Sequence, residues 1–336
     1  MLAYRSMAQA VPDIVSSAPA PKSYRILPTY LAGLLPFSIN FSFWFLSIVF
    51  SFFLIIAFSH LLQKFTISHF GVFFTLSLFM FNRYTFGVYV YNYFQLVDLF
   101  SLLWLILAFF ALYHRNWWLL VSVSLLGILT KEVILLLVPT LFYYFWAKDD
   151  EWKTKSVFIV LFIFIFLGWI SFISPGDKGH YLWERLMNNL PKLYSWKHWG
   201  ELFINTFTPL SFLPLIFFET SKKFLRDHSY FIVFTVFCAI STLFAGTAER
   251  LMIPVAIPFY LLMAKILQEW SYPGDWKLWS IFVLAFVCLF HHEMGVVNLP
   301  SRKMTIILYI SSLVITTFIG FWMRTKHKLQ QAKIAN

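Results

Sequence analysis

Charged residues are scarce in this chain of 336 residues. Lys and Arg together number 26, Asp and Glu 15, and the four types make up 12% of the sequence. A soluble domain carries about 25% charged residues and covers its surface with them. Hydrophobic residues make up 60%, and phenylalanine alone occurs 42 times. The composition therefore excludes soluble globular, disordered and collagen-like classes and predicts an integral membrane protein surrounded by lipid.

Cysteines and recognisable catalytic motifs are also nearly absent. The two cysteines, Cys238 and Cys288, lie in apolar runs and give no disulfide framework. The sequence contains no phosphate-binding glycine loop, dinucleotide fingerprint, nucleophile elbow or H-E-x-x-H zinc motif. His291, His292 and Glu293 are adjacent, and neighbouring histidines cannot share one face of a helix. This run therefore does not predict a metal site.

From Phe41 onward, apolar runs alternate with short polar breaks, the pattern of a polytopic all-α membrane protein. A helix needs about 20 residues to cross about 30 Å of hydrocarbon, and on this basis we expect about eleven transmembrane helices. The expected ranges are roughly 41–63, 69–90, 93–113, 117–130, 133–147, 156–174, 202–218, 230–246, 251–267, 278–292 and 304–323.

Two of these runs, 117–130 and 133–147, are short for a span. They could form one helix of about 30 residues that carries Lys131 and Glu132 at mid-membrane. Two adjacent ions at the bilayer centre cost several kcal/mol without partners, and Pro139 would kink such a helix. A helical hairpin with Thr130, Lys131 and Glu132 at its tip is therefore favoured.

The chain is expected to divide into an outer-face loop, a membrane domain and a tail. Residues 1–40 carry prolines at positions 12, 19, 21 and 28, which predict short interfacial helices. Residues 41–324 form the transmembrane domain, with a second outer loop at 175–200. The basic tail, 325–336, follows a span and predicts a cytoplasmic C-terminus. The net charge of +11 then reflects loops facing anionic lipid headgroups rather than nucleic acid.

Ionisable residues that this topology gathers at the outer face are the candidate site, because burying a charge in or near hydrocarbon is costly. Basic side chains there could clamp the phosphate of an anionic lipid. A nearby carboxylate could take the proton from an acceptor hydroxyl. The candidates are Arg25, Lys131 and Arg250 for the phosphate, Asp98, Glu132 and Asp13 for the proton, and Glu249 and Arg83 for acceptor binding or support.

Several of these residues also have a purely structural interpretation. Asp98 can stabilise the start of a helix, where the helix dipole favours an anion. Lys131 and Glu132 can form a solvated turn or an internal ion pair, and Arg250 can extend its side chain to lipid headgroups as an ordinary anchor. Both interpretations stay open at the level of the sequence.

Three segments, taken in order, resemble the GT-C superfamily of polytopic glycosyltransferases, which take sugar from a polyprenyl- or dolichyl-phosphate donor. The stretches Tyr4–Ala8 and Tyr24–Pro28 are similar to the first outer loop of bacterial members. Residues 97–139 resemble their central helices, in which an acid opens one span and a TKE- or TKG-like turn divides the next two. Residues 248–262 resemble a later span that starts with an arginine.

The resemblance implies a mannosyltransferase-like, inverting transfer of a sugar from a polyprenyl-phosphate donor to a lipid-linked glycan or other acceptor. It implies the inner membrane of a bacterium and a role in cell-envelope glycan biosynthesis. Lys131, Arg250 and Arg25 would hold the donor phosphate, where negative charge develops. Asp98 or Glu132 would orient the acceptor or help bind a divalent metal ion, Mg²⁺ or Mn²⁺, which some relatives use.

The sequence departs from the family pattern at its start. Family members have a cytoplasmic N-terminus, a first span and an early Asp or Asp-Glu pair needed for catalysis. That Asp would fall just upstream of Met1, which indicates a truncated reading or a member that has lost activity. Two other functions stay open: a transporter or flippase of an anionic lipid or small solute, and a non-catalytic subunit of a glycan-assembly complex. The sequence shows no repeated halves that would favour the transporter.

Overall fold

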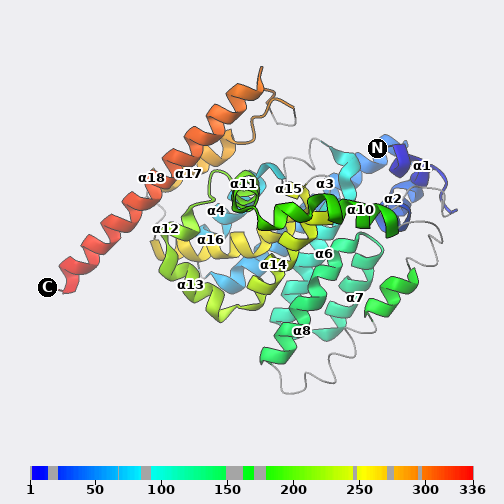
Figure 1. The fold of residues 1–336 in the computed structure, drawn as a ribbon, viewed down its shortest axis with the longest axis horizontal. Helices are drawn as coiled ribbons and strands as arrows, with labels where there is room; N and C mark the ends of the chain where they lie inside the picture. The colour runs from blue at the N-terminus through cyan, green and yellow to red at the C-terminus, as the bar shows by residue number, and fades with distance from the viewer. Residues whose placement is uncertain are drawn as a thin grey trace. The chain divides into compact units, whose positions relative to one another are not determined.

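In the structure, a computed structural model, the regular secondary structure of the described residues is helical. These residues are 2–13, 22–66, 68–84, 92–148, 162–169, 179–244, 248–270, 276–293 and 297–335. Within these ranges, extended pairing is limited to an isolated bridge between His291 and Asn298. The predicted all-α class is therefore confirmed (Figure 1).

The chain divides into two compact units. Unit 1 comprises Met1–Ala57, Asn92–Tyr194 and Tyr230–Gly246, and unit 2 comprises Phe58–Tyr91, Ser195–Ser229 and Thr247–Asn336. The helix α3 (Ile39–Phe65) begins in unit 1 and ends in unit 2. The other helices of unit 1 are α1 (Leu2–Gln9), η1 (Lys22–Tyr24), α2 (Ile26–Leu34), η3 (Tyr93–Gln95), α6 (Leu96–Tyr113), α7 (Trp117–Ile128), η4 (Glu132–Leu136), α8 (Leu137–Lys148), a helical stretch at 162–169, α10 (Gly179–Asn189), η5 (Leu190–Tyr194), α14 (Tyr230–Ser241) and η6 (Thr242–Phe244).

The helix α6 lies at the centre of unit 1. Its sequence is apolar on nearly every side, which is expected of a helix that other helices surround. Phe100 stacks on Phe50 of α3 with ring centroids 3.6 Å apart, and Phe109 meets Phe234 of α14 edge to face at 4.9 Å. These contacts bury α6 and fix the start of this helix, where Asp98 lies.

The helices α7 and α8 form an antiparallel hairpin, as the sequence predicted. Trp117 near the start of α7 contacts Phe145 near the end of α8, with ring centroids 5.3 Å apart. Between them, η4 packs closely on α7 at Gly127. A Cβ built at this glycine would lie only 2.5 Å from Cγ1 of Ile134 in η4, so a larger residue would not fit there. The hairpin therefore places the turn at Lys131 beside the start of α6, to which α7 is also packed.

Unit 2 contains a second group of packed helices. Tyr260 meets Phe79 edge to face at 5.5 Å, and Trp276 meets Trp322 at 5.3 Å. The second contact shows that α17 and α18 run antiparallel, side by side (Figure 1). The helices of this unit are α4 (His69–Met80), α11 (Trp196–Phe207), α12 (Leu213–Ile216), α13 (Phe218–Asp227), α15 (Ala248–Met252), η7 (Ile253–Val255), α16 (Ala256–Trp270), α17 (Trp276–Val287) and α18 (Arg302–Ala335).

Several helices have the length and composition of membrane spans. Among the described residues, the stretches long and apolar enough to cross a membrane are Ile39–Phe65, Tyr93–Tyr113, Ala248–Glu269 and Arg302–Thr325. The pair Phe218–Asp227 and Tyr230–Phe244, bent by 98°, gives a fifth if it forms one broken span. These helices are those of a multi-pass membrane protein, and the described residues provide four or five such spans, which do not confirm the expected number of eleven.

One expected span is wrong as a single helix. The range 202–218 is split, because α11 ends at Phe207 and α12 begins at Leu213. Pro209 has no backbone N–H and disfavours helical conformation in the residue before it. Thr208 accordingly adopts φ −54° and ψ 136°, outside the helical region. The expected span 156–174 falls largely outside the described residues.

Gly33 allows α1 to lie against α2. A Cβ built at Gly33 would lie 2.3 Å from the carbonyl oxygen of Ala8, a backbone atom. Gly33→Ala should therefore displace α1 and lower the free energy of unfolding by about 1–3 kcal/mol. The matched control is Gly200→Ala in α11, whose Cβ would meet no described atom within 4 Å. Thermal unfolding in detergent checks this, and equal melting temperatures for the two variants would contradict it.

Candidate functional site

The start of α6 places a carboxylate in the interior of unit 1. Asp98 lies in the first turn, where the helix dipole favours an anion. Its side chain is 4% exposed, and Oδ1 accepts a hydrogen bond of 2.6 Å from Nζ of Lys131. The Ser101 hydroxyl donates to the backbone carbonyl of Asp98 at 2.8 Å. Asp98 is therefore both the helix-start residue and a partner of the predicted phosphate-binding lysine.

The turn between α7 and η4 directs Lys131 toward Asp98. The Thr130 hydroxyl donates to the carbonyl of Leu126 at 2.8 Å and accepts a hydrogen bond of 3.0 Å from Nε1 of Trp104 on α6. Lys131 leaves the helix with an extended backbone, φ −168° and ψ 143°. Its side chain is 6% exposed, so the turn delivers a buried ammonium group rather than a solvated one.

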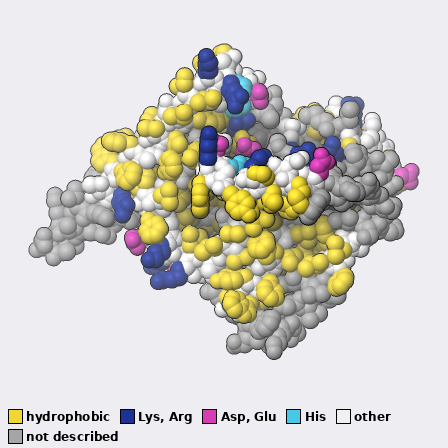
Figure 2. All heavy atoms as spheres, viewed as in Figure 1, with side chains coloured by type: hydrophobic (Ala, Val, Ile, Leu, Met, Phe, Trp, Pro, Cys, Tyr) yellow, Lys and Arg dark blue, Asp and Glu magenta, His cyan; other side chains and the backbone are white. Residues whose placement is uncertain are grey.

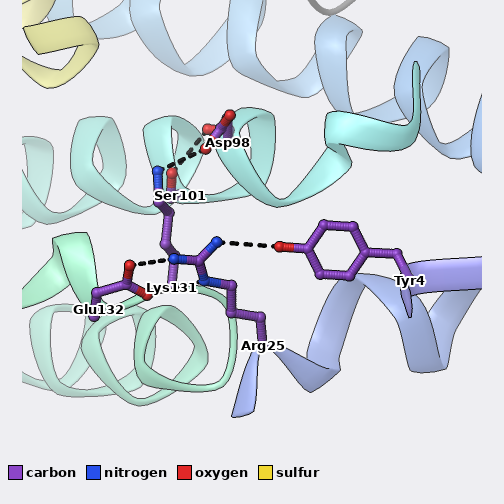
Figure 3. Close-up of polar contacts among 6 residues, drawn as sticks. All are labelled: Tyr4, Arg25, Asp98, Ser101, Lys131 and Glu132. Atoms are coloured by element: carbon purple, nitrogen blue, oxygen red, sulfur yellow. Dashed lines mark hydrogen bonds and ion pairs between the residues drawn. The ribbon is translucent and has the colours of Figure 1, made fainter. Parts of the chain in front are cut away.

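Arg25, near the N-terminus of the chain, completes the cluster. It precedes α2, and the N–H of Leu27 donates to the carbonyl of Leu129 at 2.9 Å, which ties α2 to the turn. The guanidinium binds both oxygens of Glu132, through Nε at 3.0 Å and through Nη2. Its Nη1 donates to the Tyr4 hydroxyl at 3.1 Å. Figure 3 shows Arg25 between Glu132 and Tyr4, with Lys131 pointing to Asp98.

The cluster contains equal numbers of positive and negative side chains, and one of its two ion pairs is more exposed than the other. Two cations, Arg25 and Lys131, pair with two carboxylates, Glu132 and Asp98. The Arg25 side chain is 12% exposed and that of Glu132 is 33% exposed, whereas both members of the other pair are nearly inaccessible. Bidentate arginine–carboxylate pairs are strong and have a well-defined geometry. Glu132 is therefore the member of the cluster that a substrate can reach most easily.

The ionisation of Arg25 follows from its surroundings. Burial, the largest single effect, lowers the pKa of Arg25, but the charges and hydrogen bonds of Glu132 and Tyr4 together outweigh it and raise that pKa above its ordinary value. Burial raises the pKa of the Tyr4 phenol, partly offset by Arg25. The arginine thus stays charged and Tyr4 stays protonated at neutral pH, which keeps the hydrogen bond between them intact.

The structure brings four of the eight predicted site residues together: Arg25, Asp98, Lys131 and Glu132. Asp13 is exposed and forms no ion pair with the described residues. The other three, Arg83, Glu249 and Arg250, belong to unit 2, with the latter two in α15. Within unit 1, the two predicted phosphate-binding bases, Arg25 and Lys131, are each paired with a carboxylate. In the described part of the chain, no group of three His, Cys, Asp or Glu side chains could hold a metal ion.

Arg83 lines a polar cavity of about 730 Å³ in unit 2. The walls come from the residues after α4, from α11 and the break that follows it, and from the loop before α18 together with the start of α18. His291 lies in this wall, and its Nδ1 accepts a hydrogen bond of 3.0 Å from the backbone N–H of Glu293. Burial lowers the pKa of His291 to about 4, and the charges of Arg83 and His292 add to the effect.

Arg83→Gln should raise the pKa of His291 from about 4. The removed positive charge opposes protonation, but burial remains, so the pKa should stay below the ordinary value of about 6.5. The other titratable and charged side chains that line this cavity are Tyr84, Glu201, His292, Glu293, Arg302 and Tyr309. Because the folded-state pKa is lowered, protonation should destabilise the fold as the pH falls from about 6.5 toward 4. NMR titration of labelled imidazole carbons checks the shift, and an unchanged or lower pKa would contradict it.

Two features of these sites were missed from the sequence. Tyr4 lies in the stretch Tyr4–Ala8 that carries the resemblance. It was not a candidate site residue, because the candidates were chosen by charge and a phenol is neutral. The run at His291 was considered only as a metal site, whereas the structure places it in a cavity with an arginine. A search for polar side chains at predicted helix ends, regardless of charge, would have included both.

No protein-family model, no curated protein and no solved structure matches this chain significantly.

Proposed function

We propose that this protein is a membrane glycosyltransferase of the GT-C type, moving a sugar from a polyprenyl-phosphate-linked donor to a lipid-linked glycan or other acceptor at the outer membrane face. One observation supports this most directly. Tyr4, Arg25, Asp98 and the turn at Lys131 and Glu132, far apart in the sequence, converge in one buried ion cluster. Buried ionisable groups in a membrane protein are costly and mark functional sites.

The proposal includes a topology of about eleven spans with a cytoplasmic C-terminus in the inner membrane of a bacterium. Four shorter apolar helices, 10–17 residues long, would supply part of the additional spans. Such helices can cross with extra turns or with local thinning of the bilayer. The shorter helices are His69–Met80, Trp117–Ile128, Glu132–Ala147 and Trp276–Val287.

In the proposed reaction, the bond between sugar C1 and the donor phosphate oxygen breaks, and the acceptor hydroxyl oxygen forms the new bond to C1 with inversion. Negative charge develops on the leaving lipid phosphate, which Arg25 and Lys131 would stabilise. The acceptor proton would go to a carboxylate acting as general base. Glu132 suits this role better than Asp98, because Glu132 is 33% exposed and Asp98 only 4%.

Donor binding on this proposal requires an exchange of partners. Arg25 is engaged by Glu132 and Tyr4 in the resting arrangement. A phosphate can accept two hydrogen bonds from the guanidinium in the same bidentate geometry as a carboxylate. It would therefore displace Glu132 from Arg25. The carboxylate released in this way becomes available to the acceptor hydroxyl. Asp98 would meanwhile hold Lys131 in position, as a positioning residue.

The test is sugar transfer by the purified full-length protein in proteoliposomes, supplied with short-chain polyprenyl-phosphate mannose and a lipid-linked glycan acceptor. The wild type should transfer the sugar. The double variant Arg25→Gln/Glu132→Gln removes one buried ion pair, keeps the cluster neutral, and should lower transfer at least about 100-fold. The control Arg226→Gln/Asp227→Asn removes an exposed pair on α13 and should transfer normally.

Two results would count against the enzyme, and a third against a catalytic role of the cluster. Absence of transfer by the wild type with mannosyl, glucosyl and arabinosyl donors would contradict the proposal. Movement of the donor across the bilayer without transfer would support a transporter or flippase instead. Equal activity of the two double variants would show that the buried cluster is structural.

A further inference from the structure

We propose that the cavity around Arg83 in unit 2 is a second anion site, which binds the phosphate headgroup of a lipid while the lipid chain lies along α18. This binding site goes beyond the transfer reaction proposed above and does not depend on it. Its volume of about 730 Å³ lies within the range of about 300–1,000 Å³ typical of ligand pockets.

Arg83 is the residue that calls for an anion. The residue is half-buried, its guanidinium carbon lies 5.0 Å from the centroid of the Tyr84 ring, and its side chain interacts with the Tyr309 hydroxyl. Its Nε is nevertheless buried without a hydrogen-bond partner among the described residues. No described carboxylate forms an ion pair with it. An arginine remains charged at any physiological pH, and a buried charge is costly unless it is paired. A phosphate in the cavity would supply the missing partner.

Two acidic residues line the cavity, and both have largely exposed side chains. Glu201 and Glu293 have side chains 61% and 67% exposed. Glu293 lies 3.4 Å from Nε2 of His292, whose backbone N–H donates to the Thr305 hydroxyl at 3.1 Å. Within the described residues, these two carboxylates pair with Lys197 and His292 rather than with Arg83.

One wall of the cavity is aliphatic and belongs to a candidate membrane span. Ile306, Ile310 and Leu313 line it at the i, i+4 and i+7 positions of α18, which places them on one helical face. Ile306 and Ile310 are also exposed. Figure 2 shows charged and histidine side chains gathered around α11 and the start of α18, next to a largely hydrophobic surface. A polar floor that continues into an aliphatic face of a span fits an amphiphilic anion better than a free one.

The test is native mass spectrometry of the full-length protein released from phosphatidylcholine nanodiscs, with farnesyl phosphate as the lipid probe. Inorganic phosphate and farnesol serve as the headgroup and the chain alone. Arg83→Gln should weaken binding at this site about 10- to 100-fold. Arg83→Lys keeps the charge and should retain more affinity than Arg83→Gln, whereas the exposed control Arg226→Gln should bind as the wild type does.

Three results would overturn the proposal. Unchanged farnesyl phosphate binding by Arg83→Gln would exclude the site. Inorganic phosphate that competes as strongly as farnesyl phosphate would show a site for a free anion. Equal binding of farnesol would show an apolar groove without headgroup recognition.

The number of bound molecules separates this site from the cluster at Arg25. If both proposals hold, the wild type should bind farnesyl phosphate twice, and Arg83→Gln and Arg25→Gln/Glu132→Gln should each bind it once. If the glycosyltransferase proposal alone is wrong, the wild type should bind one molecule and Arg83→Gln none. If the cavity proposal alone is wrong, Arg83→Gln should keep the full wild-type number.

Discussion

Replacing Lys131 by Met should destabilise the protein by about 3–5 kcal/mol, the cost of leaving a buried charge without its partner. The Nζ of Lys131 lies 2.6 Å from Oδ1 of Asp98, and both side chains are almost fully buried. Methionine has a similar length and no charge, so packing is largely kept while the carboxylate loses its counter-ion. Equilibrium unfolding in detergent checks the free energy of unfolding.

The second mutation of the pair gives the control. Lys131→Met/Asp98→Leu removes both charges and should recover most of the lost stability, because a buried ion pair is often replaced by apolar residues at little cost. Lys265→Met breaks a half-exposed pair with Glu269 at 3.8 Å and should change the free energy of unfolding by about 1 kcal/mol or less. A single variant Lys131→Met as stable as Lys265→Met would contradict the inference that the Asp98 charge is buried.

Features set by local sequence were predictable. Apolar runs of sufficient length predicted α3, α6, α16 and α18 near their observed positions, because length and hydropathy decide whether a helix can cross a membrane. The hairpin of α7 and α8 followed from the cost of placing Lys131 and Glu132 at mid-membrane. The break at Thr208 was also present in the sequence, since Pro209 disfavours a helix, but the apolar run concealed it.

The pairing within the site was not predictable, because it depends on contacts between distant segments. Asp98 and Lys131 lie 33 residues apart on neighbouring helices, whereas Arg25 and Glu132 are 107 residues apart. The sequence shows which residues are charged but not which charges neutralise one another. Arg25 and Lys131 were expected to bind a phosphate, and the structure pairs both with carboxylates. This difference changes the expected mechanism from simple capture of an anion to exchange of one anion for another.

That exchange leads to an unusual expectation for Glu132→Gln. The variant should bind short-chain polyprenyl phosphate about tenfold more tightly than the wild type, because the phosphate no longer competes with a carboxylate for Arg25. Sugar transfer by the same variant should nevertheless fall about 10²- to 10⁴-fold, since the proposed general base is lost. Isothermal titration in detergent measures the affinity, and transfer in proteoliposomes measures the rate.

The matched variant is Arg25→Gln, which should lose both affinity and transfer because the phosphate then has no guanidinium to bind. Opposite changes in affinity for Glu132→Gln and Arg25→Gln, with transfer lost in both, would be difficult to explain by misfolding. A Glu132→Gln variant with weaker binding would instead show that the carboxylate positions Arg25 for the phosphate rather than competing with it. In that case the ion pair is part of the binding-competent state, and the proton acceptor must be another group.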